Sequence, residues 1–153
     1  EKRMYTLLLV DDEEEVTQII AKKVKWNELG FSVVGHANNG LKALEMLEEI
    51  QPDVVMTDIR MPYMDGLELC GQIREKYPAT KLVLFTGFDD FEYAKEAIRL
   101  GVTRFLLKPS NMDELEEAIE CMCANLNLAH FSRVFKKQVG VSANEYRNQV
   151  LGK

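Results

Sequence analysis

The chain has 153 residues, 46% of them apolar, and a formal net charge of −6. This length and composition predict one globular domain with a buried core and room for a small appendage. The sequence contains no apolar run long enough to span a bilayer, and its three cysteines, an odd number without metal-ligand spacing, are typical of the reducing cytoplasm.

Apolar runs alternate with segments of helical spacing along the chain. Each run predicts a strand, and each following segment, in which apolar residues recur every three or four positions, predicts a helix. The expected strands are Tyr5–Val10, Phe31–Val34, Asp53–Thr57, Lys81–Thr86 and Val102–Leu107. The expected helices run from the acidic residues 11–15 to Gly30, then over 41–50, 67–73 and 91–100, and onward from Asn111; residues 35–40 are expected to form a turn. Five strands alternating with five helices predict an α/β fold, a doubly wound parallel sheet covered on both faces.

Polar residues close four of the five predicted strands. Asp11 and Asp12 follow the first strand, Asp58 follows the third, Thr86 ends the fourth and Lys108 follows the fifth. In a parallel sheet these strand ends share one edge, which is where ligands bind in open α/β folds. Each residue taken alone has an ordinary explanation as a helix cap, strand residue or surface charge, but their joint occurrence predicts a chemical site.

Three carboxylates placed together require a cation, and oxygen ligands suit Mg²⁺, which also binds phosphate oxygens. The cation, Lys108 and Thr86 would then contact the oxygens of a phosphoryl group, and Asp58 would act as the nucleophile that accepts it. The glycine-rich signatures of dinucleotide binding and of nucleotide hydrolysis are absent from the sequence.

The segments LLLVDDE (7–13), VVMTDIRMPYMDG (54–66), LFTGF (84–88) and RFLLKP (104–109) together resemble the receiver domain of two-component response regulators. This resemblance covers residues 4–126 and implies a flavodoxin-like sheet order of 2-1-3-4-5. It implies that Asp58 is the phosphoacceptor for a sensor histidine kinase. It further implies Mg²⁺ (or Mn²⁺) held by Asp11, Asp12, Asp58 and the backbone carbonyl of Arg60, with Lys108 on the phosphoryl oxygens and Thr86 and Phe105 as switch residues.

Two further features are particular to this chain. Arg60 and Phe88 lie two residues past Asp58 and Thr86, and we hypothesise that these bulky side chains hinder attacking water and slow loss of the phosphoryl group. Residues 26–47 resemble the receivers that precede AraC-type DNA-binding domains.

Residues 127–153 form a tail with a charge of +4, against −10 for the rest of the chain, which suggests a separate partner. The stretch FSRVFKKQVGVSANEYR resembles the last helix-turn-helix of AraC-type domains, with Arg133, Lys136 and Lys137 as candidate DNA contacts. A complete domain of that type is several times longer, so we expect the chain to derive from a longer regulator by internal deletion or engineered splicing. DNA binding is therefore expected only in an intact parent, and the tail is expected to pack on a receiver.

The leading interpretation is a cytoplasmic, phosphorylation-switched receiver from an AraC-type transcriptional regulator, which is not an enzyme and has no membrane partner. The first alternative is a stand-alone receiver that acts through protein–protein contact, dimerising through the receiver or the tail. The second is a phosphohydrolase with an aspartyl nucleophile, which is disfavoured because no second acid lies two residues past Asp58.

Overall fold

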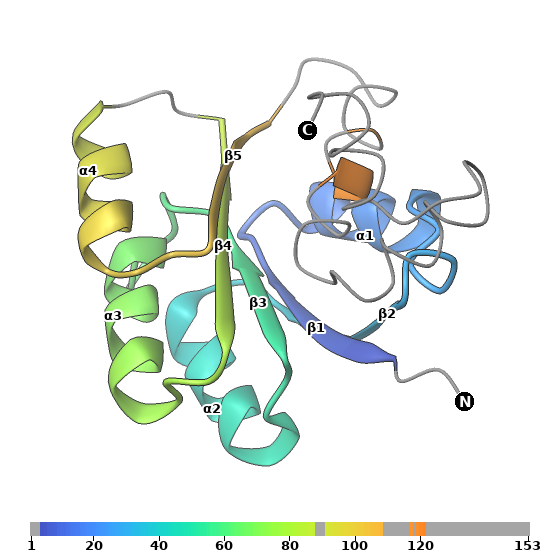
Figure 1. Cartoon of the computed structure of the whole chain (residues 1–153), viewed down its shortest axis with the longest axis horizontal. Helices are drawn as coiled ribbons and strands as arrows, with labels where there is room; N and C mark the ends of the chain where they lie inside the picture. Colours follow the sequence, from blue (N-terminus) through green and yellow to red (C-terminus); the bar gives the residue numbers. More distant parts are fainter. Residues whose placement is uncertain (1–3, 88–90, 109–116, 118, 122–153) are drawn as a thin grey trace, which may run out of the picture.

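The computed structural model describes residues 4–87, 91–108, 117 and 119–121. Its centre is a five-stranded parallel sheet of order β2-β1-β3-β4-β5, flanked by helices, which confirms the predicted fold class and strand order (Figure 1). The strands are β1 (Tyr5–Val10), β2 (Phe31–Ala37), β3 (Val54–Thr57), β4 (Lys81–Thr86) and β5 (Arg104–Leu107). The helices with described bounds are α1 (Glu14–Lys23), α2 (Gly40–Ile50), α3 (Gly66–Lys76) and α4 (Phe91–Arg99).

Side chains of the central strands alternate between two hydrophobic cores because successive residues of a strand point to opposite faces. Leu7 and Leu9 face the core that α1 covers, together with Ile119 from the segment predicted to be the fifth helix. Leu8 and Val10 face the core that α2, α3 and α4 cover, and Figure 1 shows these three helices together on one side of the sheet. Burial on both faces explains why the strands read as continuous apolar runs.

The second strand is longer than predicted. The sequence suggested a turn from Gly35 onward, but β2 continues to Ala37 past a register shift, after which Leu8 pairs with Gly35. A Cβ atom at Gly35 would lie 2.7 Å from the methyl carbon of Met46 in α2. Glycine at this position therefore permits close packing of α2 on the strand and does not mark a turn. The prediction of a turn beginning at Gly35 was wrong.

The first helix is shorter than predicted, ending at Lys23 rather than near Gly30. The chain then folds back so that the indole N–H of Trp26 donates to the carbonyl of Ile20 at 3.1 Å, which places the indole in the core. Gly30 has a φ of 88° and ends this turn, a conformation that glycine adopts without strain.

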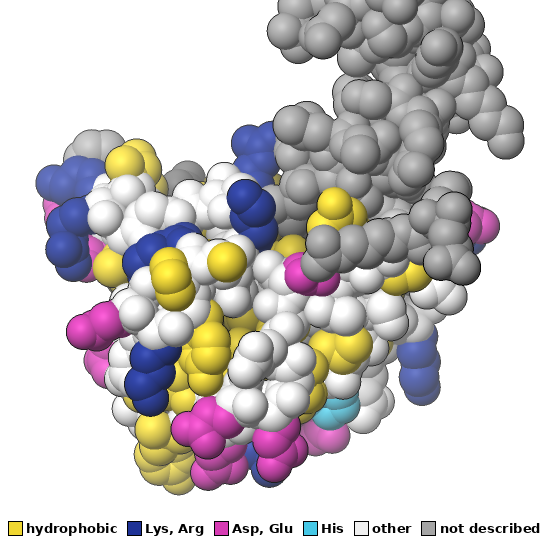
Figure 2. All heavy atoms as spheres, turned by 60° about the horizontal axis from the view of Figure 1, so that its bottom comes forward, with side chains coloured by type: hydrophobic (Ala, Val, Ile, Leu, Met, Phe, Trp, Pro, Cys, Tyr) yellow, Lys and Arg dark blue, Asp and Glu magenta, His cyan; other side chains and the backbone are white. Residues whose placement is uncertain are grey.

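The surface carries a mixture of charged and apolar side chains. On the face that Figure 2 presents, acidic side chains gather near the lower margin and apolar side chains lie between charged ones. Tyr63 and Ile98 are the most exposed of the large apolar residues described, at 85% and 79%. Within the described part of the chain, no helix has both the length and the apolarity needed to cross a membrane.

Candidate functional site

The sheet ladder continues one residue beyond β1, β3 and β5 and fixes the residues of the site at its carboxyl edge. The N–H of Asp58 donates to the carbonyl of Val10 at 2.9 Å, and the N–H of Asp11 donates to the carbonyl of Ala37 at 3.0 Å. The N–H of Lys108 likewise donates to the carbonyl of Thr86 at 2.8 Å. Because these bonds extend the parallel pairing, the side chains that follow β1, β3 and β5 emerge at one edge, as predicted.

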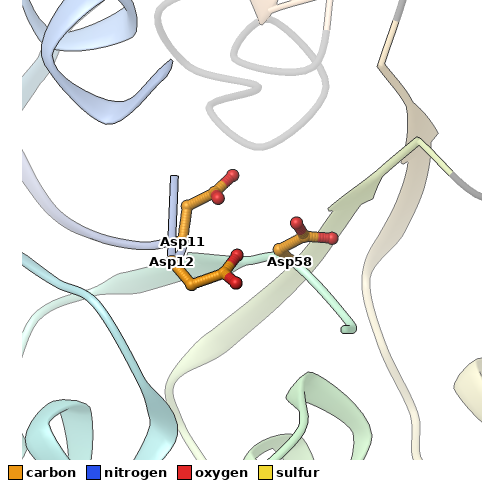
Figure 3. Close-up of side chains that lie close together, drawn as sticks. All are labelled: Asp11, Asp12 and Asp58. Atoms are coloured by element: carbon orange, nitrogen blue, oxygen red, sulfur yellow. The ribbon is translucent and has the colours of Figure 1, made fainter. Parts of the chain in front are cut away.

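Three carboxylates meet at this edge. One oxygen from each of Asp11, Asp12 and Asp58 lies within 4.8 Å of the others, and Figure 3 shows the three side chains converging from the ends of β1 and β3. Asp11 and Asp58 are 7% and 5% exposed, whereas Asp12 is open to solvent. An all-oxygen donor set with one solvent-facing side suits a hard cation that keeps part of its water shell, so these residues fit Mg²⁺.

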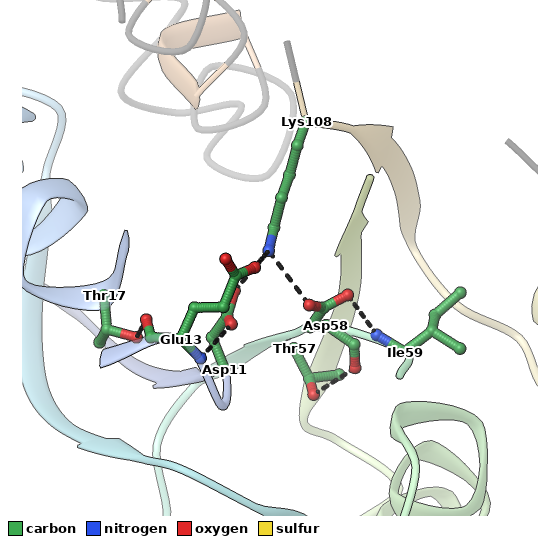
Figure 4. Close-up of polar contacts among 7 residues, drawn as sticks. All are labelled: Asp11, Glu13, Thr17, Thr57, Asp58, Ile59 and Lys108. Carbon is green, nitrogen blue, oxygen red and sulfur yellow. Dashed lines mark hydrogen bonds and ion pairs between the residues drawn. The ribbon is translucent and has the colours of Figure 1, made fainter. Parts of the chain in front are cut away.

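Lys108 bridges the carboxylates of Asp11 and Asp58. Its Nζ lies 2.7 Å from Asp11 Oδ2, 3.1 Å from Asp58 Oδ2 and 3.4 Å from Glu13 Oε1 (Figure 4). The ammonium also lies 5.8 Å from the ring centroid of Phe85, within the range of a cation–π contact. The contact with Glu13 was not predicted, although Glu13 belongs to the acidic run after β1.

Burial and ion pairing shift the pKa values of Asp11 and Lys108 in opposite directions. Burial raises the pKa of Asp11 above its ordinary value, and hydrogen bonds from Lys108 and from the Glu13 N–H oppose that shift without cancelling it. For Lys108, burial alone would lower the pKa, but the hydrogen bond with Asp11 and the charges of Asp11 and Asp58 leave it raised. The lysine is therefore held in its charged form, while burial makes the charged form of Asp11 costly.

The backbone around Asp58 fixes the orientation of its carboxylate. Oδ1 accepts the N–H of Ile59 at 2.7 Å, which leaves Oδ2 directed towards Lys108. The hydroxyl of Thr57 donates to the Asp58 carbonyl at 2.9 Å, and the N–H of Gly66 donates to the Ile59 carbonyl at 2.7 Å. A Cβ atom at Gly66 would lie 1.9 Å from the Asp58 carbonyl oxygen, so the loop closes this tightly only with glycine. The sequence alone did not reveal this close approach.

The other predicted residues lie around this centre. Thr86 is fully buried at the end of β4, and Phe105 is partly buried on β5, packed against the core on the side of α2, α3 and α4. The side chain of Arg60 is exposed, and its Nε donates to the hydroxyl of Tyr93 in α4 at 3.0 Å. Four residues named from the sequence lie outside the described residues: Phe88, Arg133, Lys136 and Lys137.

Comparison with protein families agrees with this geometry. Residues 7–120 match the response regulator receiver domain, and residues 121–148 match the bacterial regulatory helix-turn-helix proteins of the AraC family. The chain therefore belongs to the response regulator receiver family. It is the receiver of a two-component response regulator, followed by an AraC-type segment.

Individual relatives point to the same class. The transcriptional regulatory protein YesN of Bacillus subtilis is 42% identical over 80% of this chain, and the chemotaxis protein CheY of Listeria monocytogenes is 38% identical over 76% of it. The alignment covers 33% of YesN but 97% of CheY, so this chain spans about a third of the length of the former.

Solved structures of receivers share the fold. The receiver domain of AraT, a response regulator from Geobacillus stearothermophilus, matches 82% of this chain and 98% of its own, with 38% identity and a TM-score of 0.71. The response regulator TrrA of Thermotoga maritima, solved in complex with Mg²⁺ and BeF, matches 76% of this chain and 97% of its own, with 30% identity and a TM-score of 0.64.

Proposed function

We propose that Asp58 accepts a phosphoryl group from the phosphohistidine of a sensor histidine kinase and that this event switches an AraC-type output. The observation that carries the proposal is the position of the Asp58 carboxylate, which is buried, bonded to Lys108 at 3.1 Å and within 4.8 Å of two further carboxylates. Positioning and charge neutralisation are what phosphoryl transfer requires of a protein.

In the proposed transfer, Asp58 Oδ2 forms a bond to phosphorus while the bond from phosphorus to the donor breaks, and the electron pair leaves with the donor group. The Ile59 N–H holds Oδ1 and thereby aims Oδ2 at the incoming group. The Lys108 ammonium is placed to pair with the phosphoryl oxygens. The chain assists only its own phosphorylation and dephosphorylation in this scheme, and so it is a signalling acceptor and not an enzyme with an external substrate.

We assign Asp11, Asp12, Asp58 and the backbone carbonyl of Arg60 as ligands of Mg²⁺ or Mn²⁺. When bound, the cation supplies positive charge that offsets both the carboxylates and the transferring group. The convergence of three carboxylates and the presence of Mg²⁺ in the complex of the related TrrA support this assignment.

Thr86 and Phe105 are the switch residues of the proposal. Thr86 ends β4 beside Lys108, and the backbone bond between these residues ties the two strand ends together. A phosphoryl group at Asp58 would draw the Thr86 hydroxyl towards it, and the space left would admit the partly buried Phe105 ring. Loss of the hydroxyl in Thr86→Ala would leave phosphorylation intact and weaken the structural response.

We propose transcriptional regulation as the output because of the AraC family match and the similarity to YesN, a transcriptional regulatory protein. In an intact parent protein, DNA would be contacted by Arg133, Lys136 and Lys137. We propose that the protein acts in the cytoplasm. The alternative is a receiver that works by protein–protein contact or by homodimerisation. Phosphorylation-dependent DNA retardation supports the regulator, whereas phosphorylation-dependent dimerisation without retardation supports the alternative.

The central proposal is tested by incubating the chain with acetyl phosphate and Mg²⁺ and measuring the intact mass. We expect wild type to gain the mass of one phosphoryl group, and Asp58→Asn, which keeps the shape of the side chain, to gain none. Omitting Mg²⁺ should suppress the gain in wild type. No mass gain in wild type, or an equal gain in Asp58→Asn, would overturn the assignment.

A further inference from the structure

Arg60 is joined to α4 by two contacts of different kinds. Its Nε donates to the Tyr93 hydroxyl at 3.0 Å, and its guanidinium carbon lies 5.7 Å from the centroid of the Tyr93 ring. The hydrogen bond fixes the end of the side chain, and the cation–π contact favours a position over the ring face. The two residues are 33 positions apart in sequence, so the pair links the loop after β3 to the first turn of α4.

Tyr93 is suited to act as the fixed member of this pair. It is partly buried and packs against the core on the side of α2, α3 and α4, whereas Arg60 is exposed. A free arginine at the surface would sample many rotamers, and an anchored partner removes most of that freedom. The position of the Arg60 side chain is therefore set by α4 and not only by its own loop.

The contact between Arg60 and Tyr93 is relevant to the reaction at Asp58 because Arg60 lies two residues past Asp58 on the same loop. Its side chain contacts Tyr93 in α4, the helix that follows β4 in the chain. An Arg60 side chain held by Tyr93 can screen the nearby acceptor from water more effectively than one that moves freely.

We propose that Tyr93 is a positioning residue for the lifetime of the phosphoryl group: it holds Arg60 as a screen beside Asp58 and thereby slows hydrolysis. The inference rests on the proposed phosphorylation of Asp58. It adds a residue of α4 to the determinants of the reaction and makes the rate of phosphoryl loss depend on the placement of that helix.

The test measures phosphoryl loss in a set of four proteins: wild type, Tyr93→Phe, Arg60→Met and the double variant. Each is phosphorylated with acetyl phosphate and Mg²⁺, desalted into Mg²⁺ buffer and followed by intact mass. Tyr93→Phe removes the hydroxyl and keeps the ring, and we expect loss to accelerate about two- to fivefold, the scale of one exposed hydrogen bond. Arg60→Met removes the guanidinium group that Tyr93 holds and should accelerate loss at least as much.

The decisive comparison is the double variant. If Tyr93 acts through Arg60, adding Tyr93→Phe to Arg60→Met has no further effect on the rate, because the group that Tyr93 positions is already gone. Tyr77→Phe is the matched control, since Tyr77 packs against the same core from the end of α3, and its lifetime should equal that of wild type. A merely structural effect of Tyr93 would appear equally in both arginine backgrounds.

Two results would overturn the inference while leaving the proposed function intact: a wild-type lifetime for Tyr93→Phe, or independent, multiplying effects of the two substitutions. Failure of every protein in the set, wild type included, to gain mass would instead refute the phosphorylation of Asp58. The extent of phosphorylation before desalting separates these cases, because the inference requires it to be the same in all four proteins.

Discussion

Removing Lys108 should destabilise the metal-free protein strongly. The side chains of Lys108, Asp11 and Asp58 are only 15%, 8% and 6% exposed, so this ion-pair cluster is largely shielded from water. In Lys108→Met the aliphatic packing is kept, but two buried carboxylates remain beside each other without a cation. Breaking a buried pair in this way costs about 3–5 kcal/mol, a large share of the roughly 5–15 kcal/mol by which a domain of this size is stable.

The assay is urea unfolding in EDTA, followed by the fluorescence of Trp26, the single tryptophan, which is buried in the core on the α1 side. Lys95→Met is the control, because Lys95 pairs with Glu92 at the surface and is 55% exposed. We expect the control to change the free energy of unfolding by less than about 1 kcal/mol. Mg²⁺ should stabilise Lys108→Met more than wild type, since the added cation takes over part of the role of the missing ammonium.

The reasoning is refuted if Lys108→Met unfolds in EDTA at the same urea concentration as wild type. It is also refuted if Mg²⁺ stabilises both proteins equally, because the lysine and the cation would then not share the carboxylates.

Three further outcomes are expected. Burial raises the pKa of Asp11 in the folded protein, so the charge of this carboxylate costs stability at neutral pH. Asp11→Asn should therefore raise the free energy of unfolding measured in EDTA. This gain should shrink as the pH falls through the pKa of Asp11, because the wild-type carboxylate then becomes protonated. Gly66→Ala should lower the free energy of unfolding by about 1–3 kcal/mol and slow phosphorylation. Gly87→Ala, in which the added Cβ meets nothing described within 4 Å, should change the free energy of unfolding little. The same urea unfolding measures the stability of both variants. Burial raises the pKa of Cys70 to about 12, so maleimide at pH 7 should label Cys70 only after unfolding, while exposed Cys121 is labelled in the native protein, as peptide mass mapping would show.

Much of the fold was predictable from the sequence because the apolar runs that indicate buried strands stop at residues that typically end such an element. The first and fourth strands, Tyr5–Val10 and Lys81–Thr86, have the bounds that the sequence predicts. Each is a continuous apolar run, which only a strand buried on both faces requires, and each run stops where polar or small residues begin. The edge strand β2 was predicted less well, since it is covered less completely and its glycine reflects packing against α2.

The members of the site were predictable, but their pairing was not. Parallel strand order alone brings Asp11, Asp58 and Lys108 to one edge, and this needs no knowledge of side-chain rotamers. The bonds of Lys108 to Glu13 and of Arg60 to Tyr93 depend on rotamers and on the placement of α4, which no local pattern encodes. The roles assigned to these residues remain predictions, and the AraC-type tail lies outside the described residues.

The contacts of Lys108 show how a phosphoryl group would alter this edge of the sheet. An ammonium has three N–H donors, and three carboxylates, those of Asp11, Asp58 and Glu13, already accept from it. A phosphoryl oxygen on Asp58 must therefore displace one of them. Glu13 has the longest contact, 3.4 Å, and a side chain 61% exposed, so losing it costs least. The backbone of Lys108 is bonded to Thr86, so this exchange of partners acts directly on the ends of β4 and β5, where the proposed switch residue lies.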